Sequence, residues 1–233
     1  YLISRAGNRA MNFSLIALGY VFYGWANPKF IFLMAATTLV DWFASVVIAH
    51  GTWRPWKVWD EPVVPLQKNA SRNRCQRWAI VLSIVSNLMS LGFFKYFNFG
   101  VESYNSLVAM LGWPQAQWDE VFRVVLPLGI SFYTFQSLSY TIDVYRGDAK
   151  AMKHFGDFAC FVSMYPHLVA GPILQFSFLA EQLENRKLTL DKFARGVAMF
   201  SLGLGKKVML ANPCGKIADT VFNAGSANPL DAW

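Results

Sequence analysis

The chain has 233 residues, of which 55% are apolar and only 15% are charged. Soluble domains usually contain about 25% charged residues, so most of this surface cannot face water in a monomer. The composition excludes a disordered chain, a fibrous protein and an ordinary soluble enzyme, and it predicts a membrane protein. The net charge of +7 includes no dense basic tract beyond Arg72, Arg74 and Arg77, so no nucleic-acid partner is expected.

Three segments are apolar enough to cross a bilayer as helices. Residues 30–49 contain a single charge, and at 1.5 Å per residue they cover the roughly 30 Å hydrocarbon core. Residues 78–99 form a second long span, and residues 11–27 form a shorter one that ends where Asn27-Pro28 turns the chain. We therefore expect an all-α, polytopic membrane protein.

Two later segments, residues 121–142 and 155–176, are long enough to span but are interrupted. The helix breakers in them are Pro127, Gly129, Pro166, Gly171 and Pro172. Lipid cannot satisfy the backbone groups that a break releases, so breaks are tolerated only inside protein or beside a water-filled cavity. We expect these two segments to line a polar cavity or re-enter the membrane, while the uninterrupted spans form the wall. A full crossing and a re-entrant hairpin both remain open for residues 155–211.

The loops give an orientation. Residues 50–77 carry six Lys and Arg against Asp60 and Glu61, so this loop should be cytoplasmic, together with residues 1–10. The loop at 100–120 has acidic residues and no Lys or Arg, which predicts the external side. Residues 177–192 are rich in charge and are expected to form a soluble loop.

Asp41 lies in the middle of the span 30–49, where an unpaired carboxylate costs about 2.5 to 3.5 kcal/mol. It therefore needs a polar cavity or a partner. One interpretation is a polar tunnel wall or proton site. The other is a structural hydrogen bond to a neighbouring helix, which we weigh somewhat higher.

His167 lies between Pro166 and Gly171 in an interrupted segment, and it is the best single candidate for a catalytic or substrate-contacting group. No acid or nucleophile stands at a fixed spacing from it, so a structural histidine is the competing interpretation. With Asp41 and His167, Gln136 and Gln175 are candidates for the wall of a substrate tunnel.

Gly203-Leu204-Gly205-Lys206-Lys207 has two features of a phosphate loop but lacks the Gly and the Ser or Thr that the Walker pattern requires. Lys206 and Lys207 are better suited to lipid headgroups, with donor phosphates as the second candidate. The three cysteines are scattered and offer no metal-ligand spacing, and no hydrolase or zinc-enzyme motif occurs. No metal or bound cofactor is expected.

Four strings occur in order along the chain: 92–99 (GFFKYFNF), 127–136 (PLGISFYTFQ), 140–147 (YTIDVYRG) and 166–173 (PHLVAGPI). Together they resemble the membrane-bound O-acyltransferase (MBOAT) family, in particular its bacterial branch that acetylates alginate. Lys206-Lys207 also matches a lysine pair of the family. The resemblance covers nearly the whole of residues 1–233, as a single transmembrane domain. It implies that the family's first helix lies before Tyr1, and that the catalytic histidine and the rest of the catalytic part lie past Trp233.

The resemblance implies a ring of helices around a thin centre, with a tunnel that joins a cytoplasmic donor pocket to an external acceptor pocket. The implied reaction is transfer of an acetyl group from a cytoplasmic thioester, acetyl-CoA or another acyl thioester, toward an exported polysaccharide such as alginate, cellulose or peptidoglycan. A periplasmic acyltransferase and the polysaccharide export machinery are the implied partners, in the bacterial inner membrane.

Two other classes of function stay open on the residues alone. Asp41 and the interrupted spans are also compatible with a channel or transporter subunit that carries out no catalysis. A scaffold that docks partners through the Trp-rich 50–77 loop is the third possibility. It predicts that changes inside the spans affect only folding.

Overall fold

The computed structural model describes residues 7–26, 28–59, 61–68, 70–113, 118, 123–164, 168, 176–184 and 189–223. Every regular element in these ranges is helical and none is a strand, which confirms the all-α prediction. The chain divides into two compact units, Tyr1–Arg186 and Lys187–Trp233. Each is described by itself.

The first unit begins with α1 (Asn8–Ala26), the short 3-10 turn η2 (Pro28–Phe30) and α2 (Ile31–His50). Gly51 ends α2 in the left-handed conformation, with φ 66°, and its N–H bonds the Val47 carbonyl. Such a residue is usually glycine because a Cβ is strained there. The predicted spans 11–27 and 30–49 therefore correspond closely to two separate helices.

The helix α3 (Arg74–Met110) is tied at its start to the end of α2. Asn73 and Gln76 form a reciprocal cap, in which each side chain bonds the other residue's backbone. The same two side chains also donate to Ile48 O of α2 and to O of Gly51, which caps α2, each at 2.8 Å. Pro28–His50 and α3 are each long enough and apolar enough to cross a membrane, as the sequence predicted.

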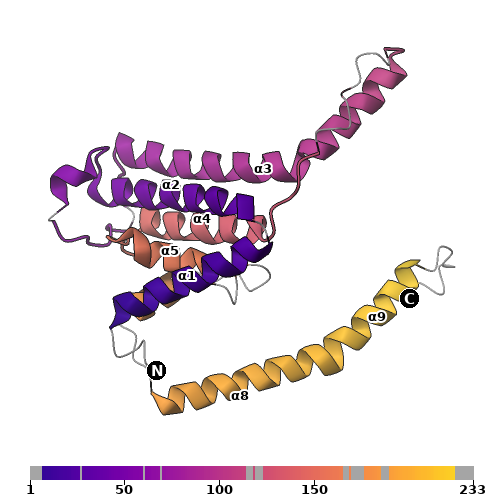
Figure 1. Cartoon of the computed structure of the whole chain (residues 1–233). Helices are drawn as coiled ribbons and strands as arrows, with labels where there is room; N and C mark the ends of the chain where they lie inside the picture. The colour runs from indigo at the N-terminus through magenta and orange to yellow at the C-terminus, as the bar shows by residue number, and fades with distance from the viewer. Residues whose placement is uncertain are drawn as a thin grey trace. The chain divides into compact units, whose positions relative to one another are not determined.

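The predicted loop at 100–120 is wrong for its first half, because α3 continues as a helix to Met110. Residues 100–110 contain no proline, and nothing in them ends a helix. The acidic residues indicate that the segment is exposed to water. They do not distinguish a loop from a helix, because a helix can also be exposed to water. Figure 1 shows this last part of α3 extending beyond the helices that it packs against.

Two asparagines of α3 hold the returning chain. The Asn98 side chain donates to Val124 O at 2.8 Å and accepts from Val124 N–H at 3.0 Å. Asn105 brackets the backbone of Trp118 in the same way, at 3.1 and 2.8 Å. Irregular backbone beside the membrane thus receives its hydrogen bonds from a helix side chain.

The helix α4 (Ile130–Arg146) begins only after Pro127 and Gly129. The prediction that a span begins at 121 is therefore wrong at its start: the two breakers close an irregular segment and do not interrupt a helix. Gly129, with φ 71°, and Gly147, with φ 87°, flank α4 at its two ends.

The helix α5 (Phe155–Ser163) has nine residues, too few to cross a bilayer, and it is followed by α7 (Phe176–Glu184). The predicted loop at 177–192 is wrong where α7 and the start of α8 occupy it. Four residues of α7 at helical spacing, Phe176, Leu179, Ala180 and Leu183, are buried or pack against the core. That apolar periodicity was hidden by the surrounding charges.

In this unit α2 packs against α3 and α4, while α1 packs on α5 (Figure 1). The contact between α1 and α5 is close at Gly19, where a Cβ would collide with the Ser163 carbonyl. The core includes Tyr23, Met34, Tyr133, Tyr140 and Phe161, all 1% exposed or less.

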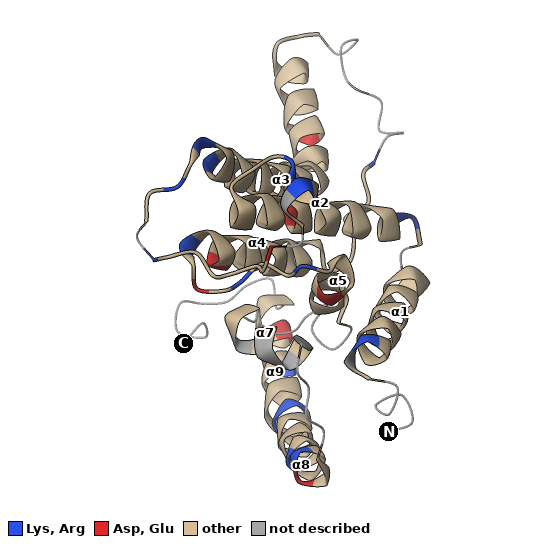
Figure 2. Ribbon diagram, turned by 90° about the vertical axis from the view of Figure 1, so that its left-hand side faces the viewer, with Lys and Arg blue, Asp and Glu red and all other residues tan. Residues whose placement is uncertain are grey.

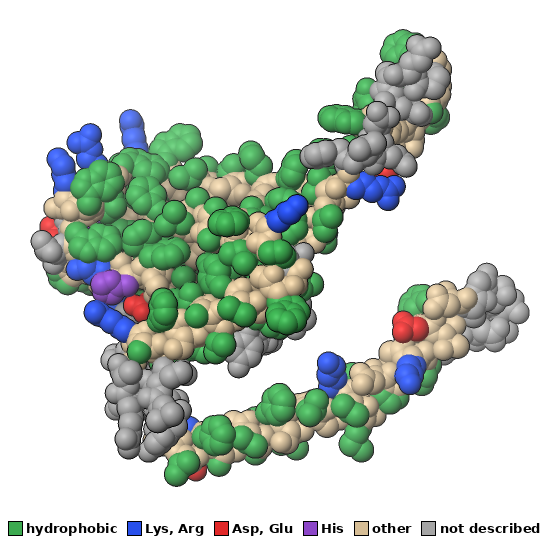
Figure 3. Space-filling view, in the orientation of Figure 1, with side chains coloured by type: hydrophobic (Ala, Val, Ile, Leu, Met, Phe, Trp, Pro, Cys, Tyr) green, Lys and Arg blue, Asp and Glu red, His purple; other side chains and the backbone are tan. Residues whose placement is uncertain are grey.

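The outer face of α3 is apolar along its length. Large exposed side chains recur at helical spacing: Trp78, Val81, Val85, Met89, Phe93 and Tyr96. Figure 3 shows hydrophobic side chains over most of the visible face of this unit, with a group of Lys and Arg at one end and a few cations elsewhere. Figure 2 places those cations on the connection between α2 and α3 and at the adjacent end of α4. This distribution is typical of a membrane protein.

The connection between α2 and α3 contains a short 3-10 helix, η3 (Pro55–Val58), and the tryptophans around it differ in environment. Trp53 and Trp59 lie against Phe43 and Trp42 of α2, whereas Trp56 is 63% exposed.

The second unit is a run of consecutive helical elements: α8 (Leu190–Lys206), the π-helical segment η5 (Lys207–Ala211) and α9 (Asn212–Asn223). Thr189 caps α8 by accepting from Lys192 N–H. None of the described side chains in this unit is buried.

Candidate functional site

Buried polar side chains line the contact between α2, α3 and α4. We call this group the polar seam, and it consists of Thr38, Asp41 and Ser45 on α2, Ser83 and Asn87 on α3, and Thr134, Ser137 and Thr141 on α4. On α2 and on α4 the spacing is the same, i, i+3 and i+7, so each set lies along one side of its helix. The seam is the polar interior of an otherwise apolar bundle.

Asp41 is the centre of the polar seam. It is fully buried, and its Oδ1 accepts hydrogen bonds from Ser83 Oγ at 2.6 Å and from Asn87 Nδ2 at 2.7 Å. Ser137 of α4 lies beside the same carboxyl group. Residues of all three helices therefore converge on one side chain. The structural interpretation required Asp41 to bond a neighbouring helix, and it does so with α3. A role of Asp41 in a tunnel stays a prediction.

Tyr140 makes a second set of polar contacts beside the seam. Its hydroxyl lies 2.8 Å from Ser45 Oγ and accepts from Met152 N–H at 2.8 Å. Because Ser45 Oγ already donates to Trp42 O, the Tyr140 hydroxyl is the donor toward Ser45. Its ring stacks on Phe158 with 4.2 Å between centroids. Tyr140 thus joins α2, α4 and α5.

Gln136 is buried on α4, and its Nε2 donates to Phe161 O of α5 at 2.8 Å. The structure therefore places this tunnel candidate at a helix contact, and its tunnel role stays a prediction. His167 and Gln175 lie outside the described residues. Lys206 is the last residue of α8 and Lys207 the first of η5, both exposed and both in the second unit. Residues 203–207 are helical, unlike a phosphate loop.

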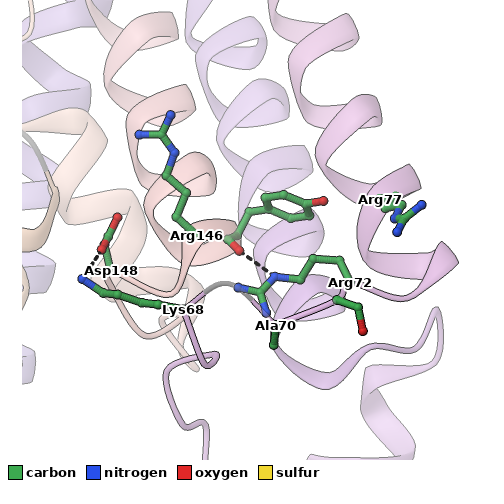
Figure 4. A pocket seen from close by; sticks show the side chains of 8 residues that line it. Lys68, Ala70, Arg72, Arg77, Arg146 and Asp148 are labelled. Carbon is green, nitrogen blue, oxygen red and sulfur yellow. Dashed lines mark hydrogen bonds and ion pairs between the residues drawn. The ribbon is translucent and has the colours of Figure 1, made fainter.

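An open cavity of about 550 Å³ lies at the cationic end of the first unit (Figure 4). We call it the basic pocket; its lining residues are Lys68, Ala70, Ser71, Arg72, Arg77, Tyr145, Arg146 and Asp148. They come from the segment before α3, from the first turn of α3 and from the end of α4. Four cations and one carboxylate therefore surround one hollow.

Contacts between distant parts of the chain hold the basic pocket together. Arg72 Nε donates to Tyr145 O at 2.9 Å, and its guanidinium lies over the Tyr145 ring, 5.7 Å from the centroid. Lys68 Nζ lies 2.7 Å from Asp148 Oδ1. This hydrogen bond lowers the pKa of Asp148 below its ordinary value and raises that of Lys68. Both side chains are therefore charged at neutral pH.

Sequence reasoning found the cations of this loop but not the pocket. It treated Arg72 and Arg77 as an orientation signal because Tyr145, the partner of Arg72 on α4, lies 73 residues further along the chain. Gly147 was the residue from which a contact between the α4 end and another segment could have been suspected. A Cβ at this position would collide with the Leu66 carbonyl, so a glycine directly after the α4 arginine marks a close backbone contact.

Known proteins are similar to this chain over nearly its whole length. It is 39% identical over 228 residues, or 98% of the chain, to the "probable alginate O-acetylase AlgI" of Pseudomonas aeruginosa PAO1. It is 40% identical over all 233 residues to the protein of the same name from Azotobacter vinelandii. The chain is a homologue of these alginate O-acetylases. The resemblance to the MBOAT family seen in the sequence is confirmed.

A more distant relative is the peptidoglycan O-acetyltransferase of Helicobacter pylori, 29% identical over 250 residues and 94% of the chain. The chain spans 40 to 42% of the length of these three relatives. No family model matches the chain, and no solved structure matches it.

Proposed function

We propose that this chain forms part of a membrane-bound O-acyltransferase that passes an acetyl group from a cytoplasmic thioester toward an exported polysaccharide. The observation that carries the proposal is the identity of about 40%, over nearly the whole chain, with proteins named as alginate O-acetylases. The peptidoglycan O-acetyltransferase among the relatives supports the same reaction on a different acceptor.

The proposed topology is a multi-pass protein of the bacterial inner membrane with residues 50–77 in the cytoplasm. The cations of this loop and at the end of α4 support that orientation. The donor would then be bound at this end and the acceptor at the other. A periplasmic acyltransferase and an export complex are the proposed partners.

The chemistry is an acyl transfer with a simple balance. A base removes the proton of an acceptor hydroxyl, the oxygen forms an ester bond with the acetyl carbon, and the carbon–sulfur bond breaks. The thiolate that leaves takes up a proton. We place the principal base beyond Trp233, as the family resemblance implies, with His167 as a supporting candidate. In this proposal the polar seam supports the packing of α2, α3 and α4.

Membranes that contain the complete protein and its partners test the proposal directly. Supplied with acetyl-CoA labelled in the acetyl group, they should transfer label to alginate or peptidoglycan, and the acceptor that is labelled identifies the substrate. No transfer to any polysaccharide with every partner present would contradict the proposal. Ion or solute flux through liposomes without any acyl donor would instead favour the channel alternative.

His167 can be tested in the same assay. His167→Ala should lower acetyl transfer without lowering the amount of protein in the membrane. His154→Ala is the matched control, because His154 is an exposed residue at the start of α5. Unchanged transfer in His167→Ala would remove this histidine from the site.

A further inference from the structure

The cations of the basic pocket exceed the acidic groups that could neutralise them. Lys68 forms a salt bridge with Asp148, whereas Arg77 and Arg146 form no salt bridge with any residue that the structure describes. Arg72 uses one of its five N–H donors, Nε, on the α4 backbone. Arg72, Arg77 and Arg146 thus all line one open cavity, with Arg77 and Arg146 on opposite sides of Arg72 (Figure 4).

Such a cluster favours a ligand with phosphate groups. Four of the lining side chains are cations and one is a carboxylate, so the local charge favours an anion. The planar guanidinium presents paired N–H donors that match two oxygens of a phosphate. The volume of about 550 Å³ exceeds what inorganic phosphate would fill and falls in the range of small-molecule sites.

The pocket is built into the fold. Its lining segment is fixed to α4 by the Arg72 hydrogen bond to Tyr145 O and by the contact of the Leu66 carbonyl with Gly147. Directly after it, the Asn73 and Gln76 caps fix the start of α3 to α2. The backbone segments that carry the arginines are therefore held in place by contacts between distant parts of the chain.

We propose that the basic pocket binds a phosphate ester, and that this ligand is the nucleotide part of the acyl thioester donor. The assignment to the donor rests on the proposed function, whereas the phosphate chemistry rests on the arginines themselves. It replaces Lys206 and Lys207 as our first candidates for the donor phosphates. An anionic lipid headgroup presents the same chemistry and is the other source that the experiment must separate.

The pocket is close to the polar seam along the same helices. Thr141 and Ser137 precede Tyr145 by one and two turns of α4, and Ser83 lies six residues after Arg77 on α3. At 1.5 Å per residue these separations are roughly 6 to 12 Å. The basic pocket and the polar seam therefore lie one to two helical turns apart along α4.

The test measures binding, without any requirement for catalysis. The full chain is placed in phosphatidylcholine nanodiscs and titrated with radiolabelled coenzyme A. Arg77→Gln with Arg146→Gln should weaken binding about tenfold or more, because two charged phosphate contacts are removed. Arg74→Gln is the matched control: it removes an exposed arginine of the same α3 turn that does not line the pocket, and binding should stay within about twofold.

A second arm separates the lipid source. Nanodiscs with equal phosphatidylcholine and phosphatidylglycerol are analysed by native mass spectrometry for lipid that stays on the protein. Loss of coenzyme A binding in the double variant supports the donor. Unchanged coenzyme A binding with loss of retained phosphatidylglycerol overturns the donor assignment and keeps the phosphate site. No change in either arm overturns the proposal.

Asp148→Asn keeps the proposal testable if the double arginine variant fails to fold. This change frees Lys68 for the ligand and removes the only pocket carboxylate among the lining residues, so coenzyme A should bind more tightly. Equal or weaker binding contradicts the proposal. The two hypotheses fail separately. If coenzyme A binding depends on the pocket but the wild-type protein transfers no acetyl group, only the proposed function is rejected. If the double arginine variant transfers acetyl groups normally, only the donor site is rejected.

Discussion

The polar seam and the basic pocket share α3 and α4, but their polar groups differ: those of the seam are buried, whereas those of the pocket line an open cavity. In the seam, Asp41, Ser83 and Asn87 bond one another across helices and are closed to solvent. In the pocket, Arg77 and Arg146 line an open cavity and form no salt bridge with a described residue. Groups that bond one another across helices stabilise a fold, even though Asp41 Oδ2 and Asn87 Oδ1 have no partner among the described residues. Cations that line an open cavity can instead bind a ligand. Changes in the seam should therefore act on stability, and changes in the pocket should act on binding.

The largest effect is expected for Asp41→Ala. The change leaves the Ser83 hydroxyl and the Asn87 amide without their acceptor, so the free energy of unfolding should fall by about 3 kcal/mol. Asp41→Asn retains an oxygen acceptor and should cost less than about 1 kcal/mol. Reversible unfolding in mixed micelles measures both. Thr38→Val is a seam control, since Thr38 bonds only its own helix at Met34 O. An equal loss in Asp41→Ala and Thr38→Val would show that Asp41 does not join the helices.

Gly147→Ala should come next, at about 2 kcal/mol. Its φ of 87° is unfavourable for a residue with a Cβ, and that Cβ would collide with the Leu66 carbonyl. Because this contact positions the pocket segment, coenzyme A binding should weaken as well. Gly92→Ala, where a Cβ meets nothing within 4 Å, should not destabilise α3. Unaltered coenzyme A binding in Gly147→Ala would show that the contact with Leu66 does not position the pocket.

Tyr140→Phe should cost about 1 to 2 kcal/mol. The phenyl ring keeps the stacking on Phe158, but the buried Met152 N–H loses its acceptor and Ser45 loses its donor. Tyr104→Phe, at an exposed site on α3, should be neutral under the same unfolding conditions. Coenzyme A affinity should not change in either variant, which distinguishes this region from the pocket.

The smallest structural effect is expected for Asp148→Asn, because Lys68 and Asp148 are both solvent-accessible and such pairs contribute little to folding. Coenzyme A affinity should nevertheless rise about two- to fivefold as Lys68 becomes available. The pKa of Asp148 is lowered, so the wild-type pair is lost only as the pH falls through that lowered pKa. The difference in affinity should therefore be constant from about pH 6 to pH 8. If the difference in coenzyme A affinity between the wild type and Asp148→Asn disappears in this range, a group other than Asp148 is responsible for it.

The sequence predicted what depends on local pattern. The span 30–49 was identifiable because twenty residues carry one charge, and the need of Asp41 for a polar partner followed from its position in that span. The identity of the partners could not follow, since Ser83 and Asn87 are chosen by helix packing. The helix α7 was missed because its charged residues concealed an apolar stripe.

The basic pocket shows the same limit at longer range. Arg72 and Arg146 are each visible in the sequence, but nothing local indicates that the segment before α3 lies against the end of α4. His167 and Gln175 were selected for their surroundings in the sequence, and they keep the status of predictions. Gly147 and Asn98 were informative residues whose meaning required the contact they make.

The length of α3 determines how the chain responds to the lipid around it. Its 37 residues extend about 56 Å, and even a tilt of 40° leaves about 43 Å to fit against a hydrocarbon core of roughly 30 Å. At least one end must therefore leave the lipid, and the number of residues outside depends on bilayer thickness. Asn105 bonds both backbone groups of Trp118 at this outer end. A thicker bilayer can consequently cover more of α3 without placing an unsatisfied Trp118 backbone in hydrocarbon.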